Sequence, residues 1–265
     1  MCRLLAYLGE PIPLEELIFK PEHSLVVQSY QPKELEFALL NADGFGMGWH
    51  HPDDITAEPF IYRNVLPIWN DANLPHLCRY IRASSFVANV RSATPGLPLD
   101  FSNCQPFRHG RLLFVHNGYI DKFRQTLYRP MRDLIGDVAY QNIYGLTDSE
   151  HIFALITHLL EMDSQLGLLG AVEQTIETIQ SLANKYDVRV SSVIILSDGQ
   201  QLVAARFDNQ DKAPSFYFLR QSAGIVLASE PLFDANWEPL TQAHSLTVAA
   251  NDIQQPHIHG FSGVS

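Results

Sequence analysis

The chain has 265 residues, of which 46% are hydrophobic and 18% charged, and its formal net charge is −11. This length is enough for one large domain with a full hydrophobic core. The acidic balance argues against a nucleic-acid partner, because phosphate binding needs clustered Lys and Arg, and the sequence has no basic run. No apolar stretch approaches the length of a membrane span, so we expect no membrane partner.

The N-terminus places Cys2 directly behind Met1. The side chain of Cys2 is small, so Met1 is cleavable in principle, and its removal would leave a thiol and a free α-amino group on one residue. An unperturbed α-amino group has a pKa of about 7.7–8.0, close enough to neutrality to take the proton that the thiol loses. The apolar run from Arg3 to Gly9 predicts a strand that holds Cys2 at its end.

Three further segments of the first half predict strands. Residues 42–49 (ADGFGMGW) contain three glycines, which indicates a tight loop that runs into a strand. The apolar runs Phe86 to Val90 and Leu112 to His116 are typical of buried strands. The first leads into Arg91-Ser92 and the second into Asn117-Gly118. We therefore expect each strand to deliver polar side chains at its end.

The second half of the chain begins with helical signals. Thr147 is followed by Glu150 at the spacing of a helix N-terminus, and a second helix is expected over Leu168 to Tyr186. From Val188 onward, short β-type runs alternate with turn signals. These elements predict an α+β fold of stacked sheets and helices, with one domain over residues 1–250 and a loop-like C-terminal tail over residues 251–265.

Several polar residues are candidates for a site, although none is specific alone. The Asn117 amide and the Gly118 N–H can converge on an oxyanion, but Asn-Gly is also a common hairpin turn. Arg91 can grip a carboxylate with two parallel hydrogen bonds, or form an ordinary surface salt bridge. Asp148 lies in the first turn of the predicted helix, where the helix dipole favours any carboxylate.

The order of the motifs along the chain is more specific than any one of them. The segments are Met1-Cys2, NADGFGMGW (Asn41–Trp49), NVRSATPG (Asn89–Gly96), NCQPF (Asn103–Phe107), FVHNGYI (Phe114–Ile120), TDSE (Thr147–Glu150) and LASEP (Leu227–Pro231). Together they resemble the class II glutamine amidotransferase domain, from residue 1 to about residue 240. The resemblance implies the four-layer αββα sandwich of the N-terminal nucleophile hydrolases.

The same resemblance implies roles for the reacting groups. It makes Cys2 the nucleophile that attacks a γ-glutamyl amide, with its freed α-amino group as the base. Asn117 and Gly118 correspond to the pair that stabilises the oxyanion. The reaction would pass through a γ-glutamyl thioester and would need no metal and no organic cofactor.

Other residues match positions that hold the substrate. Arg91 corresponds to the arginine that binds the α-carboxylate of the glutamyl group, and Asp148 to the acid that binds its α-ammonium group. Ser92 and Thr94 are further candidates for substrate contacts, because they flank Arg91 in the same loop. Arg3 and Glu230 also lie in resembling segments, but the resemblance gives them no firm role.

A narrower similarity bears on the substrate. CRLLAYLG, LVVQSYQP and LLNADGFGMGW are similar to the stand-alone members that act in ergothioneine biosynthesis, which remove the γ-glutamyl group from γ-glutamyl-hercynylcysteine sulfoxide. Most family members pass ammonia to a second, synthase domain, for which we expect no room in this chain. Ser92-Ala93-Thr94-Pro95-Gly96 replaces the His-Gly or Trp of several amidotransferases, so a leaving group larger than ammonia fits the sequence.

Two alternatives remain open at this point. The chain can be a glutaminase subunit that supplies ammonia to a separate synthase; the partner would then be that synthase, and otherwise a further copy of this chain in a homo-oligomer. It can also be a catalytically silent binding domain, in which Met1 would stay in place. The odd count of three cysteines, without disulfide or zinc spacing, predicts reduced thiols in a cytoplasmic protein. The pairs His50-His51 and His257/His259 lack second partners at ligand spacing, so we expect loops there and no metal site.

Overall fold

The computed structural model describes residues 1–34, 40–93, 99–210 and 212–261. In this part of the chain the strands form two sheets. The first contains β1 (Arg3–Pro13), β2 (Phe45–Trp49), β3 (Phe60–Asn64), β4 (Arg82–Val90), β9 (Tyr217–Gln221), β10 (Gly224–Ala228) and β11 (Glu238–Pro239). The second contains β5 (Phe107–His109), β6 (Leu112–Ile120), β7 (Val190–Ser197), β8 (Gln201–Asp208), β12 (His244–Ala249) and β13 (His257–Gly260).

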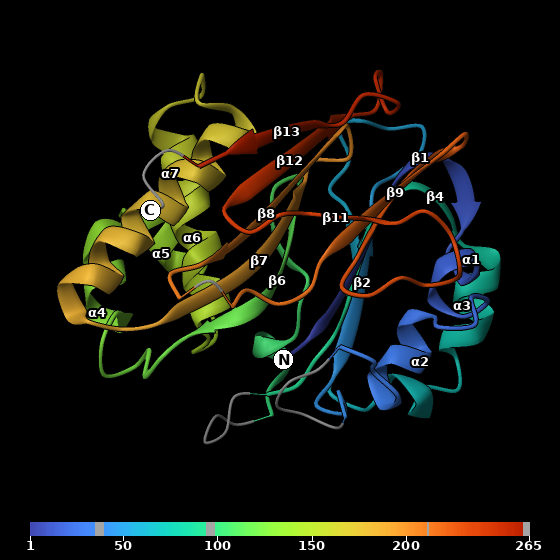
Figure 1. Cartoon of the computed structure of the whole chain (residues 1–265), viewed down its shortest axis with the longest axis horizontal. Coiled ribbons are helices and arrows are strands. Elements are labelled where there is room, and N and C mark those ends of the chain that lie inside the picture. The colour runs from blue at the N-terminus through green and yellow to red at the C-terminus, as the bar shows by residue number, and fades with distance from the viewer. Residues whose placement is uncertain (35–39, 94–98, 211, 262–265) are drawn as a thin grey trace.

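The strand order places β1 and β6 inside their sheets. It is β11-β9-β10-β1-β4-β2-β3 in the seven-stranded sheet and β13-β12-β8-β7-β6-β5 in the six-stranded sheet, as far as the described ranges go. The strand pairs in both sheets are antiparallel. Figure 1 shows the two sheets stacked against each other between two layers of helices. The predicted αββα sandwich is therefore confirmed.

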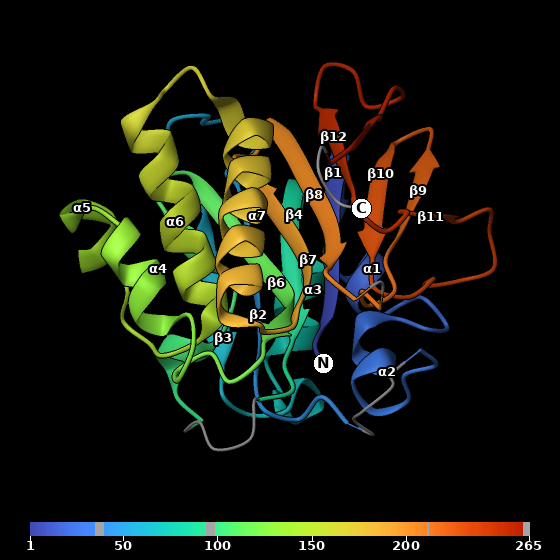
Figure 2. The same cartoon turned by 60° about the vertical axis from the view of Figure 1, so that its left-hand side comes forward.

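The helices divide between the two outer faces. The first sheet carries α1 (Glu15–Ile18), α2 (Leu25–Tyr30) and α3 (Leu74–Tyr80). The second carries α4 (Tyr128–Leu134), α5 (Asp137–Gln141), α6 (Asp148–Met162) and α7 (Gly167–Tyr186), of which α6 and α7 lie across the sheet in Figure 2. Two short 3-10 helices, η1 (Ile68–Asn70) and η2 (Phe101–Asn103), complete the described elements. No helix in the described ranges is long and apolar enough to span a membrane.

The apolar side chains form three layers, one between the two sheets and one between each sheet and its helices. The alternation of side chains along the strands explains how one strand contributes to two of them. In β1, Leu4 and Leu8 point into the core between the sheets, whereas Leu5 and Tyr7 pack against α1–α3. The same alternation runs through β4 and β6. Because both faces of these strands are buried, their sequences are continuous apolar runs and not alternating ones.

Several sequence predictions hold at the level of single elements. The expected strands and the two long helices are present, and the Thr147 hydroxyl caps α6 by accepting a hydrogen bond from the Glu150 N–H at 3.3 Å. One prediction is wrong in its end point. The strand expected to stop at His116 continues through Asn117 and Gly118 to Ile120, so these two residues form neither a strand end nor a turn.

A second correction concerns the C-terminal segment. Residues His257–Gly260, predicted as loop, form β13 and pair with β12 at the edge of the second sheet. His50 is also not in an exposed loop: it is 2% exposed, and its Nε2 lies 2.9 Å from the Arg111 carbonyl oxygen. The boundary at residue 250 between a domain and a tail stays a prediction.

Candidate active site

Cys2 lies at the start of the central strand of the first sheet. Arg3 pairs with Val90 on β4, so Cys2 is next to the residues that follow β4, and its Sγ lies 3.9 Å from the Ser92 carbonyl oxygen. The alternation of β1 places Cys2 on the same face as Leu4, toward the second sheet. The residue is only partly buried. Figures 1 and 2 both show the N-terminus between the sheets at one end of their strands.

Arg91 is a buried cation held by the loop before β2. The backbone N–H of Arg91 donates to the Gly44 carbonyl at 2.8 Å, and the Asp43 carboxylate accepts from the Ala93 backbone N–H at 2.8 Å. Arg91 is 5% exposed and forms no ion pair with a carboxylate of the described residues, which contradicts the surface salt bridge. The guanidinium makes a long hydrogen bond, from Nη1 to the Asp43 backbone carbonyl oxygen at 3.5 Å. It therefore remains available for the carboxylate of a ligand.

Gly44 is required where this loop turns into β2. Its φ is +106°, in the region that side chains rarely adopt, and a Cβ there would lie 2.8 Å from the Asn64 carbonyl oxygen and 3.0 Å from the Cys104 sulfur. The glycine lets the backbone of Asp43 and Gly44 approach Arg91. Thus the glycine-rich segment positions the arginine.

Asn117 points from β6 into the space between the sheets. It follows Val115, which belongs to the inter-sheet core, on the same face of the strand. Asn117 is 0% exposed, and neither its Nδ2 nor its Oδ1 has a hydrogen-bond partner in the described structure. Gly118 follows with its backbone against β7, where a Cβ would overlap the Ser191 carbonyl oxygen. An unpaired amide and an adjacent N–H are the groups that an oxyanion site needs.

The backbone and the side chain of His116 are both held by hydrogen bonds. The Gln105 side chain pairs with its backbone, accepting from the His116 N–H at 2.6 Å and donating to its carbonyl at 3.0 Å. The His116 Nδ1 lies 2.8 Å from the Ser149 hydroxyl. Burial lowers the pKa of His116 and favours its neutral form. These contacts fix the strand immediately before Asn117, and nothing in the sequence singled out Gln105 for this task.

Asp148 connects α6 to the end of β6. Its Oδ2 accepts from the Ile120 N–H at 2.8 Å, and its Oδ1 from the Ser149 N–H at 2.7 Å. The carboxylate is only partly buried and retains lone pairs for a cation. Of the two remaining candidates, Ser92 contacts Cys2 through its carbonyl, whereas Thr94 lies outside the described residues.

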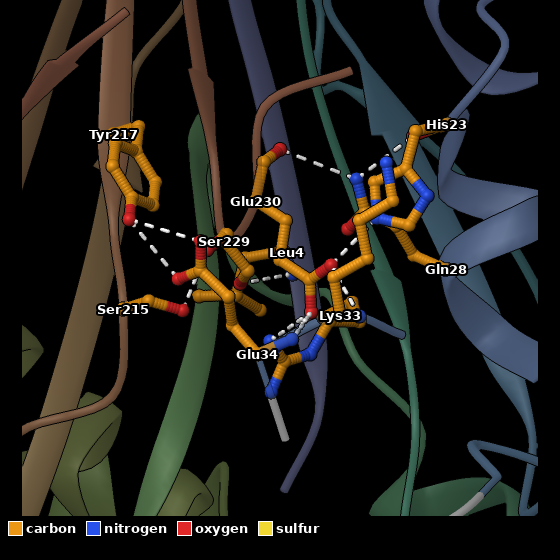
Figure 3. Close-up of polar contacts among 10 residues, drawn as sticks. Leu4, His23, Gln28, Lys33, Glu34, Ser215, Tyr217, Ser229 and Glu230 are labelled. Carbon is orange, nitrogen blue, oxygen red and sulfur yellow. Dashed lines mark hydrogen bonds and ion pairs between the residues drawn. The ribbon is translucent and has the colours of Figure 1, made fainter. Parts of the chain in front are cut away.

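Arg3, the residue after Cys2, forms a buried ion pair with Glu230. Figure 3 shows the polar contacts around Glu230. The Glu230 carboxylate accepts from Arg3 Nη1 at 2.9 Å and lies 2.6 Å from His23 Nε2. It also accepts from the backbone N–H groups of Lys33 at 2.9 Å and Glu34 at 3.0 Å. Burial alone would raise the pKa of Glu230, but these donors and the charge of Arg3 outweigh it and hold the pKa below its ordinary value.

We expect Glu230→Ala to destabilise the fold by about 3–5 kcal/mol, because it leaves the Arg3 charge buried without its partner. The measurement is the free energy of unfolding in urea. Glu238→Ala is the matched control: it breaks the Arg220–Glu238 pair, which has the similar length of 2.8 Å but is half exposed. That change should cost no more than about 1 kcal/mol. Equal losses in the two variants would contradict the role of the buried pair.

A cavity of about 940 Å³ lies apart from these residues. It is lined by side chains of β3, β5 and α6, among them Arg63, Phe107 and Phe153, and includes none of the candidate site residues. In the described part of the chain, no three His, Cys, Asp or Glu side chains gather as a metal site.

The sequence profile described as glutamine amidotransferases class-II matches residues 22–222. The chain belongs to this family. The predicted family, and with it an enzyme of the glutamine amidotransferase class, is confirmed. The candidate residues therefore lie on an amidotransferase fold, directly before β1, directly after β4, on β6 and at the start of α6.

Two named relatives match nearly the whole chain. A Mycolicibacterium smegmatis protein named gamma-glutamyl-hercynylcysteine sulfoxide hydrolase is 30% identical over 259 residues, which are 97% of this chain and 98% of the relative. A Saccharomyces cerevisiae protein named Probable glutamine amidotransferase DUG3 is 32% identical over 298 residues, covering 96% of this chain and 83% of the relative.

Solved structures agree with the fold. A glutamine aminotransferase class-II domain protein from Silicibacter pomeroyi superposes with a TM-score of 0.72 at 28% identity, covering 98% of this chain and all of the other. The glutamine phosphoribosylpyrophosphate amidotransferase of B. subtilis gives a TM-score of 0.65 at 14% identity, covering 99% of this chain and 50% of that one. The second likeness concerns the fold alone.

Proposed function

We propose that this enzyme hydrolyses a γ-glutamyl C–N bond with Cys2 as an N-terminal nucleophile. The observation that carries the proposal is a pair of buried polar groups at the Cys2 end of the sandwich, which among the described residues are a cation without a carboxylate partner and an amide without a hydrogen bond. Arg91 is a buried cation without an ion-pair partner, and Asn117 is a buried amide without a hydrogen bond, both within the described structure. A glutamyl group supplies a carboxylate for the first and a carbonyl oxygen for the second.

The reaction begins once Met1 has been removed. The Cys2 sulfur attacks the γ-carbonyl carbon, a C–S bond forms, and the oxygen takes up negative charge that Asn117 and Gly118 stabilise. The thiol proton passes to the α-amino group and from there to the leaving nitrogen as the C–N bond breaks. Water then attacks the thioester, and glutamate and the free thiol are released.

The surroundings of the N-terminus support the α-amino group as the base. Burial lowers the pKa of the terminal amino group of Met1 below its ordinary value. Removal of Met1 would move the amino group one residue toward the sheet. We therefore expect burial to favour the neutral form of the Cys2 amine, which is the form that can accept a proton.

Arg91 and Asp148 would hold the glutamyl head group. The guanidinium of Arg91 binds the α-carboxylate with two hydrogen bonds, and the carboxylate of Asp148 binds the α-ammonium group. Ser92 and Thr94 stay candidates for further contacts in the same loop. No step of this reaction needs a metal or an organic cofactor.

The substrate we propose is γ-glutamyl-hercynylcysteine sulfoxide. The M. smegmatis relative supports this choice, because it is named as the hydrolase of that compound and the match covers 98% of its length. The test is the release of glutamate from that compound compared with release from glutamine. We expect the sulfoxide to be the better substrate by kcat/KM, and a strong preference for glutamine would contradict this choice.

A glutaminase subunit is the second candidate, since the S. cerevisiae relative is named as a glutamine amidotransferase. In that case activity on glutamine would depend on an added synthase partner. An intact Met1 on the isolated protein would instead favour a silent domain of the same fold. The reduced cysteines favour a cytoplasmic location for any of these functions.

A further inference from the structure

Two of the places where polar side chains are buried between the sheets involve β4. At one, the Ser85 hydroxyl on β4 lies 3.2 Å from the Ser197 hydroxyl on β7, so each serine satisfies the other. At the other, Asn89 on β4 and Asn117 on β6 are both 0% exposed, and all four of their side-chain amide atoms lack a partner in the described ranges. One buried polar pair is therefore satisfied, whereas the asparagines are not.

The side chain of Asn89 faces the second sheet. On β4, Val87 belongs to the inter-sheet core, whereas Ala88 and Val90 pack on the helical side. Because strand side chains alternate, Asn89 shares the inter-sheet face with Val87. Its direct neighbours are Leu4 on β1 and Gly46 on β2. Asn89 is thus beside β1, the strand that follows directly after Cys2.

The serine pair shows how the sheets are aligned. Ser197 pairs with Leu113 on β6, so Ser85 lies over the Leu113 end of β6. Leu113 also lies close to Gly48, where a Cβ would be 2.9 Å from its side chain. Four residues further along β4 is Asn89, and four residues further along β6 is Asn117. The direction is the same on both strands, because Gly48 on β2 lies against Leu113, whereas Gly46, the β2 partner of Asn89, lies against Gln105, which holds His116. The two asparagines therefore lie toward the same end of the inter-sheet space, on opposite walls.

The cost of this arrangement indicates a ligand. Each buried polar group without a partner costs about 1–3 kcal/mol. An apolar residue at position 89 would avoid that cost, as its neighbours Val87 and Leu4 do. An unpaired side-chain amide offers N–H donors and an acceptor oxygen, which complement the C=O and N–H of another amide.

We propose that Asn89 contacts the scissile amide of the substrate: its Oδ1 accepts a hydrogen bond from the amide N–H, while Asn117 on the facing sheet donates to the carbonyl oxygen. In a trans amide the C=O and N–H point in opposite directions, so two walls can hold one bond from both sides. This inference rests on the proposed function and extends it to the leaving-group side. Asn89 would select amides over esters, because an ester oxygen has no hydrogen to donate and its lone pairs repel Oδ1.

The test compares a γ-glutamyl methylamide with the γ-methyl ester of glutamate, which differ only in N–H against O. The variant is Asn89→Leu, which keeps the approximate shape and removes both unpaired polar atoms. We expect the ratio of kcat/KM for the amide to kcat/KM for the ester to be about tenfold lower in the variant than in the wild type. A tenfold change is the effect of one neutral hydrogen bond. Its melting temperature should be unchanged or higher, because no hydrogen bond of the protein is lost.

Two further variants serve as controls. Ser85→Ala breaks the satisfied inter-sheet pair and should leave the ratio of amide to ester activity unchanged. Asn117→Leu should reduce hydrolysis of amide and ester alike, because both substrates contain the carbonyl oxygen.

The outcomes separate the inference from the proposed function. An equal loss on amide and ester in Asn89→Leu, or no loss on either, would overturn the role of Asn89. A clear fall in melting temperature would overturn it too, because it would indicate a structural hydrogen bond. If the wild-type protein hydrolyses neither substrate although Met1 is absent, the proposed function itself has failed.

Discussion

Cys2→Ala is expected to abolish glutamate release, with a loss in kcat of at least about 10³-fold. Removing the nucleophile of a covalent mechanism in other enzymes costs up to about 10⁶-fold, and the remaining binding groups retain only a small residual rate. The fold should be unaffected, because Cys2 is partly exposed and makes one long sulfur contact, 3.9 Å from the Ser92 carbonyl. The measurement is single-turnover glutamate release together with a thermal melt.

Cys78→Ala is the matched control for the nucleophile. Burial, with the nearby charges of Glu15 and Asp71, raises the pKa of the Cys78 thiol to about 12, so it stays protonated and inert at neutral pH. This variant should keep wild-type activity. If Cys2→Ala retained the wild-type rate, the assignment of the nucleophile would be wrong.

The second large effect is expected for Asn117→Ala, which should lower kcat by about 10²–10³-fold. The loss of one oxyanion donor has that size, because the charge develops only in the transition state. KM should change little for the same reason. Since neither amide atom of Asn117 has a partner among the described residues, the substitution breaks no hydrogen bond of the fold.

Asn209→Ala provides the comparison for Asn117. The Asn209 amide donates to the Val188 carbonyl at 2.9 Å and accepts from the Val190 N–H at 3.0 Å. Its loss should lower the free energy of unfolding and leave kcat unchanged. The opposite pattern, an Asn117 variant that is unstable but normal in kcat, would assign Asn117 to structure.

The elements that the sequence predicted well are those with strong local signals. The helix at Thr147 has its capping spacing, and the strand at Arg3 has a continuous apolar run. The extent of β6 was not predictable in this way. Asn-Gly favours a turn locally, but pairing of Asn117 with Val193 and of Gly118 with Ser192 keeps both residues in the strand.

Contacts between distant residues explain the remaining differences. The Arg3–Glu230 pair joins residues 227 positions apart, and Gln105 holds the backbone of His116 from another segment. The resemblance placed Arg3 and Glu230 in family segments, but only the fold shows that they meet. The strand at His257–Gly260 forms because β12 offers an open edge, which its own sequence does not indicate.

The role of Asn89 shows a further limit. Asn89 is the first residue of the motif NVRSATPG, but the resemblance gave it no role, and its neighbours Ala88 and Val90 are typical of any buried strand. Only its register beside Leu4, its zero exposure and its unpaired amide distinguish it from a core residue. Polar side chains that are buried and unpaired are therefore more informative about this site than the sequence motifs alone.

The most direct test of the account is mass spectrometry of the N-terminal peptide from enzyme quenched in acid during turnover. The peptide is expected to begin at Cys2 and, in part of the molecules, to carry a γ-glutamyl group as a thioester on its sulfur. The Cys2→Ala protein should show no such group. An active enzyme with Met1 still attached, or with the glutamyl group on another residue, would contradict the central claim.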